Sequence, residues 1–150
     1  MSDPGAFPQE IIDAAIAAGD EWDIWPSVTL SQWALESDWG RAMPPHSNNP
    51  FGIKAGLHQQ AVIVPTHEVI HGQRVEIMAR FRIFVTLGGA FDAHAMLLAT
   101  AHAYHAAQDA DTADEFADAL TGVYATDPQY GAKLKEIMRA HNLYRYDDQL

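Results

Sequence analysis

The segment QWALESDWG, residues 32–40, places a glutamate at the end of a mostly apolar run. Residues 27–37 read as a helix that is apolar nearly all round, which predicts burial in the centre of a domain. Glu36 falls in its last turn, where the negative end of the helix dipole and apolar neighbours both raise a carboxyl pKa. A carboxyl that stays protonated near neutral pH can act as a general acid. The alternative, a solvated glutamate at a helix end, stays open from this segment alone.

Acid-catalysed cleavage of a glycosidic bond requires a second functional group, usually another carboxylate, across the scissile bond. Asp38 is too close in sequence, because residues two apart lie on different sides of a helix, and we expect it to be structural. Glu68, in PTHEVIHG, is better placed if a β-hairpin arches over a groove. The competing interpretation is that Glu68 forms an ion pair across the hairpin with Arg74, Arg80 or Arg82.

Aromatic side chains are plentiful enough to line a sugar-binding cleft, since aromatic faces pack against pyranose rings. We expect Trp39, Phe51 and Tyr124 to lie in the cleft, and Trp33 and Phe81 to lie in the core.

Metal and nucleophile chemistry are not indicated. His102 and His105 lie three positions apart, on one face of a helix, and could form part of a metal site. Zinc sites usually need three or four ligands, however, and the HExxH pattern is absent. The chain has no cysteine and no G-x-S-x-G elbow. We expect no metal and no cofactor.

The remaining patterns predict the elements that position these residues. A helix is expected over 8–18 with Gly19 as its stop, and a long functional loop over 40–60. AVIVPTHEVI and RVEIMARFRIF alternate as strands joined by a turn at residues 71–73.

Three further helices are expected in the second half of the chain. One spans 89–107, and one begins at Thr112 with a capping box to Glu115. The last begins near Asp127-Pro128. The residues expected to face inward from the last two helices are Phe116, Leu120, Val123, Tyr130, Leu134, Ile137 and Met138. The sequence thus predicts one α+β domain over residues 1–150, mainly helical with one small β-hairpin.

The charge of the chain argues against some classes of binding partner. The 150 residues carry 9 Lys and Arg against 20 Asp and Glu, a net charge of −11. Such a charge argues against nucleic acid and against capture by anionic membranes. No apolar run reaches the roughly 18–20 residues of a membrane span. The opening MSDPGAFPQE has no signal-peptide pattern, so we expect synthesis in the cytoplasm and release by a holin or a secretion machine.

Several motifs together resemble a known family. They are PSVTLSQWALESDWGRA, NNPFGIKA, PTHEVIHGQ, ARFRIF and VYATDPQYGAKL, in this order. Their succession is similar to the β-N-acetylglucosaminidases of the flagellar-muramidase type, glycoside hydrolase family 73, which cut peptidoglycan in bacteria and phages. The resemblance extends from about residue 11 to residue 144 and implies a lysozyme-like fold with a groove beside a hairpin lobe.

The resemblance also implies roles for individual residues. Glu36 matches the general acid and Glu68 the second carboxylate of the hairpin. Tyr124 matches an aromatic beside the acid. The positions expected to bind substrate are Trp39, Asn49, Phe51, Gly52, Tyr124 and Asp127. Two positions depart from the family pattern: Asp38 replaces a small residue, and Phe84 stands where tyrosine is usual.

The function implied is cleavage of the β-1,4 bond between N-acetylglucosamine and N-acetylmuramic acid by a monomer resembling a phage endolysin. Three alternatives stay open: a muramidase, a lytic transglycosylase, and a non-catalytic glycan-binding or assembly module. The mechanism is also open between inversion, with carboxylates about 6.5–9.5 Å apart, and attack by the substrate's own N-acetyl group.

Overall fold

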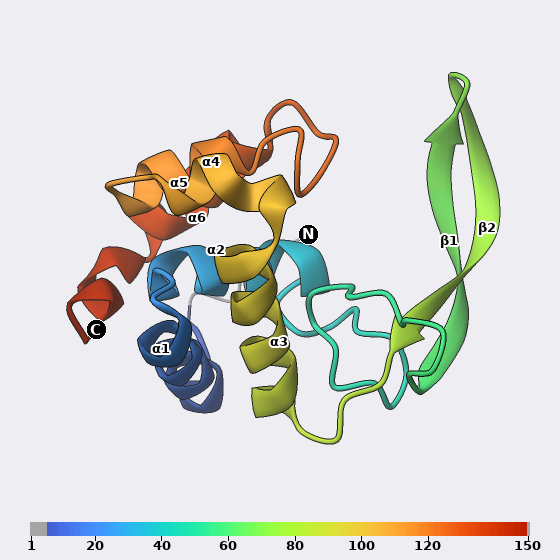
Figure 1. The fold of residues 1–150 in the computed structure, drawn as a ribbon, viewed down its shortest axis with the longest axis horizontal. Coiled ribbons are helices and arrows are strands. Elements are labelled where there is room, and N and C mark those ends of the chain that lie inside the picture. The colour runs from blue at the N-terminus through green and yellow to red at the C-terminus, as the bar shows by residue number, and fades with distance from the viewer. Residues whose placement is uncertain (1–5, 150) are drawn as a thin grey trace.

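A computed structural model describes residues 6–149 as a helical body with a β-hairpin standing beside it (Figure 1). The helices are α1 (Gln9–Trp22), α2 (Pro26–Ser37), α3 (Leu87–Thr100), η1 (His102–Tyr104), α4 (His105–Gln108), α5 (Ala113–Ala119), α6 (Tyr130–Ala140) and η2 (Leu143–Gln149). The strands are β1 (Ala61–Ile70) and β2 (Gln73–Arg82). The predicted α+β class, mainly helical with one hairpin, is confirmed for these residues. Residues 1–5, at the start of the segment tested for a signal peptide, lie outside the described residues.

The central position predicted for α2 is confirmed. Ten of its residues are buried, and it packs against α1, α6 and η2. The helix begins at Pro26 with Trp25 as its N-cap, one residue earlier than expected. The Ser27 hydroxyl donates to Asp147 of η2 at 2.7 Å. A buried central helix with a polar last turn is what carries Glu36 from the core to the surface.

The first helix is longer than predicted. Gly19 does not stop it but lies buried within α1, which continues to Trp22 and ends at Asp23 in a left-handed conformation with φ of 57°. Glycine is tolerated inside a helix at a cost of about 1 kcal/mol, so tertiary packing overrides the local stop signal here.

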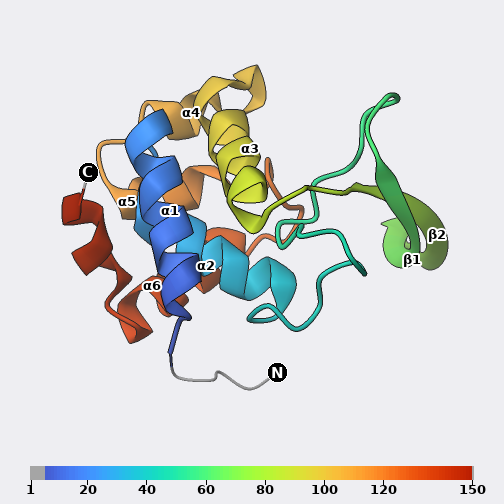
Figure 2. The ribbon, with the colours of Figure 1, turned by 90° about the horizontal axis from the view of Figure 1, so that it is seen from below.

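The hairpin has the predicted strands. β1 and β2 pair antiparallel, with Glu68 opposite Val75, and His71 and Gly72 form a two-residue turn. Both turn residues have positive φ, 51° and 79°, as the tight turns of β-hairpins require. Figures 1 and 2 show the hairpin projecting from the body in both views.

The base of the hairpin is tied to the long loop that precedes it. The Arg82 amide donates to the Ile53 carbonyl at 2.9 Å, and the Ala55 amide donates to the Arg80 carbonyl at 3.0 Å. The loop over 40–60 was predicted, and it connects α2 to β1 with no helix of its own. These bonds fix one wall of the space between the hairpin and the body.

The second half of the chain differs from the prediction in detail. The helix expected over 89–107 breaks at Ala101 into α3, η1 and α4. Val123 is exposed at 48% because α5 ends at Ala119, whereas Phe116 and Leu120 are buried as expected. α6 begins at Tyr130, two residues later than the proline signal indicated, and Ile137 is only partly buried.

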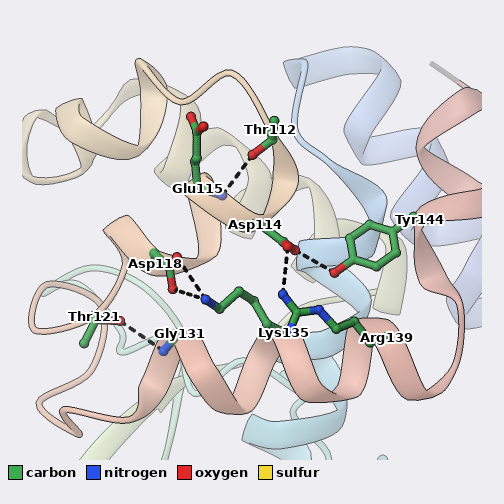
Figure 3. A network of polar contacts seen from close by, with 9 residues as sticks. All are labelled: Thr112, Asp114, Glu115, Asp118, Thr121, Gly131, Lys135, Arg139 and Tyr144. Carbon is green, nitrogen blue, oxygen red and sulfur yellow. Dashed lines mark hydrogen bonds and ion pairs between the residues drawn. The ribbon is translucent and has the colours of Figure 1, made fainter.

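Polar contacts hold α5 against α6, as Figure 3 shows. Asp114 of α5 accepts hydrogen bonds from Arg139 at 3.1 Å and from Tyr144 at 2.6 Å, and Lys135 pairs with Asp118 at 2.9 Å. The Thr121 hydroxyl accepts the Gly131 amide at 3.0 Å. This network fixes the first turn of α6, where Tyr130 lies.

Candidate active site

A groove of about 870 Å³ lies where the helical body, the long loop and the hairpin meet. This is a volume typical of ligand-binding clefts. Its lining comes from four parts of the chain: Glu36 of α2; Ala42, Met43, Pro44, Pro45, Asn49, Pro50, Phe51, Gly52, Ile53 and Lys54 of the loop; Val64, Pro65, Thr66 and Phe81 of the hairpin; and Leu97, Tyr104, Tyr124 and Ala125 of the helical half. Of the predicted site residues, the groove brings together Glu36, Asn49, Phe51, Gly52 and Tyr124.

Glu36 presents its carboxyl to the groove from the last turn of α2. Its Oε1 accepts a hydrogen bond from the Tyr130 hydroxyl at 2.9 Å. Burial of the carboxyl raises the pKa of Glu36, and the Tyr130 hydrogen bond, which stabilises the ionised form, opposes part of that rise. The raised pKa expected from the sequence is therefore present, and burial is its main cause.

Behind Glu36 lies a chain of buried hydrogen bonds. The Tyr130 hydroxyl accepts the Gln32 side-chain amide at 3.0 Å, and the Gln32 carbonyl oxygen lies 2.8 Å from Nε2 of His94. Gln32 and His94 are fully buried, and Tyr130 is 2% exposed. Burial lowers the pKa of His94 to about 3, so its imidazole is neutral. The chain runs from α3 through α2 to α6 and ends at the Glu36 carboxyl.

The loop residues form the floor of the groove. Asn49 is fully buried, and its side-chain amide donates to the Ile53 carbonyl at 2.8 Å and to the residue 82 carbonyl at 2.9 Å. The Phe51 ring stacks on His94 with centroids 4.0 Å apart. Gly52 has φ of 67°, a conformation that glycine adopts without strain. Asn49 thus braces the turn, and Phe51 closes the floor over the core.

Tyr124 stands beside the acid. Its ring stacks on Tyr130 with centroids 5.7 Å apart, and its hydroxyl reaches the Phe51 carbonyl at 3.5 Å. Burial and the nearby Glu36 charge raise the pKa of Tyr124 well above its usual value, so the phenol stays neutral. The resemblance implied an aromatic at this place, and Tyr124 lines the groove there.

Glu68 lies on the hairpin beyond the groove residues, toward the turn. It shares a strand face with Val64 and Thr66, which line the groove, because alternate residues of a strand point to one side. Its Oε1 lies 3.4 Å from Nζ of Lys54, a groove residue. The ion pair with an arginine across the hairpin is not formed; the partner is a lysine of the loop.

Two predicted substrate-binding residues lie away from the groove. The first is Trp39, which has a left-handed backbone, as does Asp38 before it. The Trp39 ring packs against Phe7 and His141 at centroid distances of 4.9 and 5.1 Å. Asp127 binds Lys133 at 2.6 Å and the Gln129 amide at 2.8 Å, at the start of α6. Neither Trp39 nor Asp127 lines the groove, and their predicted substrate-binding roles stay predictions.

The structure also shows the surroundings of three other residues singled out in the sequence, Asp38, Phe84 and Phe81. Asp38 pairs with Arg41 at 2.9 Å, in line with its expected structural role. Phe84 is buried, and the guanidinium carbon of Arg82 lies 4.4 Å from the centroid of its ring. Phe81, expected in the core, is only partly buried and lines the groove because it lies on the hairpin face turned toward it.

Sequence reasoning missed Gln32, His94 and Tyr130 as parts of the site. Tyr130 was assigned to the core, and its ring is indeed buried; its hydroxyl contact with Glu36 spans 94 positions of sequence. The available signal was Gln32, a long polar side chain one turn before Glu36 in a helix expected to be buried. His94 could have been noticed as a lone histidine inside an apolar helix.

Across residues 6–149, no group of three or more histidine, aspartate or glutamate side chains gathers in a way that could hold a metal ion. No helix in the same range is long and apolar enough to span a membrane.

Known proteins resemble the chain over most of its length. It is 35% identical over 136 residues to exo-glucosaminidase LytG of Bacillus subtilis, covering 86% of this chain and 48% of that protein. It is 34% identical over 151 residues to a probable N-acetylmuramidase of Lactococcus lactis, covering 95% and 34%. The chain thus spans half or less of the length of these relatives.

Solved structures agree. The catalytic domain of the autolysin Auto from Listeria monocytogenes matches with a TM-score of 0.80 at 27% identity, over 98% of this chain and 91% of that one. A peptidoglycan hydrolase mutant from Sphingomonas sp. A1 matches with a TM-score of 0.78 at 30% identity, over 93% and 97%. The model of the glucosaminidase family, described as mannosyl-glycoprotein endo-beta-N-acetylglucosaminidase, matches residues 12–143. The chain therefore belongs to the glucosaminidase family of glycoside hydrolases.

Proposed function

We propose that this chain hydrolyses the β-1,4 bond between N-acetylglucosamine and N-acetylmuramic acid in peptidoglycan, with Glu36 as the general acid. The observation that carries the proposal is the placement of Glu36, a carboxyl with a raised pKa, in a groove large enough for a glycan strand. The relatives named as a glucosaminidase and an autolysin support the substrate class. The site of action would be the bacterial cell wall, with the chain working as a monomer.

Catalysis begins with a protonated Glu36. Its proton passes to the glycosidic oxygen as the bond to the anomeric carbon breaks and an oxocarbenium-like centre develops. The resulting Glu36 carboxylate is stabilised by the hydrogen bond from Tyr130. Tyr124, which lines the groove and is only partly buried, offers ring surface for a sugar.

Glu68 is the second carboxylate in this proposal. It would activate the attacking water if the hairpin brings it over the groove, or orient the substrate if the N-acetyl group attacks first. Its position on the groove-facing side of β1 supports the first role, and its Oε1 lies 3.4 Å from Nζ of Lys54, a residue of the groove lining.

Replacing Glu68 tests its role. We expect Glu68→Gln to lower kcat about 10²- to 10⁴-fold, the range for loss of a general base, with little change in binding to insoluble walls. The matched control is Glu76→Gln, which removes an exposed carboxylate from the opposite face of the same hairpin. Equal rates for Glu68→Gln and wild type would leave Glu68 as an ion-pair residue only.

Product analysis separates the proposal from a muramidase, which the Lactococcus relative's name favours as second candidate. Mass spectrometry of digested peptidoglycan should reveal new reducing N-acetylglucosamine ends. Reducing muramic acid ends would establish a muramidase, and anhydro-muramic acid ends a lytic transglycosylase. No new ends, together with binding to walls, would establish a non-catalytic glycan-binding module.

A further inference from the structure

The hydrogen-bond chain behind Glu36 has a direction that follows from its chemistry. Tyr130 has one hydroxyl proton, and Glu36 in its ionised state, after it has given up its proton, can only accept, so the hydroxyl then donates to Oε1 of Glu36. The Tyr130 oxygen must then accept from Gln32, which presents its NH₂ group at 3.0 Å. This leaves the Gln32 carbonyl oxygen to face Nε2 of His94 at 2.8 Å, so His94 must donate from Nε2.

The environment of His94 supports that assignment independently. A neutral imidazole carries one N–H and one lone pair, on different nitrogens. Among the described residues, Nδ1 of His94 is buried and has no hydrogen-bond partner. An unpaired buried N–H is rarer than an unpaired buried acceptor, so the lone pair belongs on Nδ1 and the proton on Nε2. Stacking on Phe51 and T-shaped contact with Tyr124 hold the ring in this orientation.

We propose that Gln32 and His94 are positioning residues that keep the Tyr130 hydroxyl proton on Oε1 of Glu36, so that the proton given to the glycosidic oxygen is carried on Oε2. The proposal rests on the function proposed above. The donor at Nε2 of His94 fixes the orientation of the Gln32 amide, which without it could rotate by half a turn. Its oxygen would then accept the Tyr130 proton, and Glu36 would lose its donor.

The other ionisable groups around Glu36 do not supply a second donor of this kind. Tyr124 donates toward the Phe51 carbonyl, and Tyr104 of η1 lies behind Tyr124 with ring centroids 6.0 Å apart. On the opposite wall, Lys54 is paired with Glu68. Tyr130 is the only one of these groups with a hydrogen bond to Glu36 among the described residues.

The test measures the pKa of Glu36 directly, by carboxyl ¹³C NMR titration, alongside kcat against pH. Gln32→Met keeps the side-chain volume and removes both polar groups. His94→Leu removes the Nε2 donor, whereas His94→Gln offers an amide N–H in its place. We expect Gln32→Met and His94→Leu to raise the Glu36 pKa and to lower kcat about 10- to 100-fold, and His94→Gln to restore both toward wild type.

Each outcome decides the proposal. An unchanged Glu36 pKa in a folded Gln32→Met or His94→Leu protein would overturn it. If neither of those two variants folds, the ¹⁵N shifts of the His94 ring in wild type decide: a proton on Nε2 supports the chain, and a proton on Nδ1 contradicts it. Since the titration needs no substrate, it succeeds or fails separately from the proposed hydrolysis, which fails only if wild type releases no glycan ends.

Discussion

At the scale of single residues, two opposing effects act on the pKa of the Glu36 carboxyl. Burial raises the pKa of Glu36, and the hydrogen bond from Tyr130 limits that rise. The two effects oppose each other because burial penalises the charged form, whereas the hydroxyl donor stabilises it. A general acid needs both, since it must hold its proton before the reaction and release it during the reaction.

Tyr130→Phe isolates the second effect. Removing the donor should raise the Glu36 pKa, so that the group remains protonated to higher pH. The basic limb of the kcat/KM profile, where activity is lost as Glu36 ionises, should then shift to higher pH while the maximal rate falls. The measurement is the pH profile of wall hydrolysis. Tyr144→Phe is the matched control, because it removes a hydroxyl that bonds Asp114, far from the groove lining. A basic limb that stays in place would contradict the account.

The sequence predicted residues of this site unevenly, for a physical reason. Glu36 was identifiable because helix polarity and apolar neighbours act locally. Tyr130 and His94 act through contacts that span 94 and 62 positions of sequence, and no local pattern encodes such a contact. Trp39 was misplaced because the left-handed backbone at Asp38 and Trp39 turns its ring toward Phe7, which the helical pattern could not show.

At the scale of elements, periodicity was a good guide to strands and to the central helix, and a poorer one to helix ends. The hairpin follows from alternation and from the turn at His71 and Gly72. The break at Ala101 was not predictable, because the long apolar run continues through it. The break brings Tyr104 to the groove rim, so this irregularity contributes to the site.

Gly131 leaves no room for a side chain where it packs. A Cβ atom there would lie 2.7 Å from the Thr121 hydroxyl oxygen and 2.9 Å from the Cα of Asp118, at the contact between α5 and α6. Gly131→Ala should cost about 1–3 kcal/mol by overpacking, equivalent to roughly 2–4 °C in Tm for each kcal/mol. It should also lower activity, since Tyr130 is the adjacent residue. Thermal unfolding measures the first effect and wall hydrolysis the second.

Gly88→Ala is the matched control. Its Cβ would lie 4.0 Å from the Thr86 hydroxyl oxygen, in ordinary contact, near the start of α3. A glycine-to-alanine change in a helix with free space is neutral or stabilising. If Gly131→Ala and Gly88→Ala had the same Tm, the close packing inferred at Gly131 would be wrong.

At the scale of the whole molecule, charge is distributed unevenly. Residues 54–86 contain four of the nine Lys and Arg residues but only two of the twenty acids, so the rest of the chain, mainly the helical body, has 5 basic and 18 acidic residues and a net charge of −13. Peptidoglycan carries carboxylates, and the body should therefore repel it at long range. Screening shortens the reach of that repulsion, because the Debye length falls from about 30 Å at 0.01 M salt to about 8 Å at 0.15 M.

We expect wall hydrolysis to become faster, by a few-fold in kcat/KM, as salt rises across that range. Walls whose carboxylates have been chemically amidated are the control and should show little dependence on salt. A rate that falls with salt on native walls would mean that the cations of the hairpin lobe, rather than the acidic body, dominate the encounter.

The central claim is that Glu36 is the acid that cleaves the glycan. The most direct measurement is the rate at which new reducing ends form on purified peptidoglycan with wild type, Glu36→Gln and Glu136→Gln, an exposed glutamate on α6 that serves as the matched control. We predict a loss of about 10²- to 10⁴-fold for Glu36→Gln with wall binding retained, and an unchanged rate for Glu136→Gln. Reducing ends released by Glu36→Gln at the wild-type rate would contradict the claim.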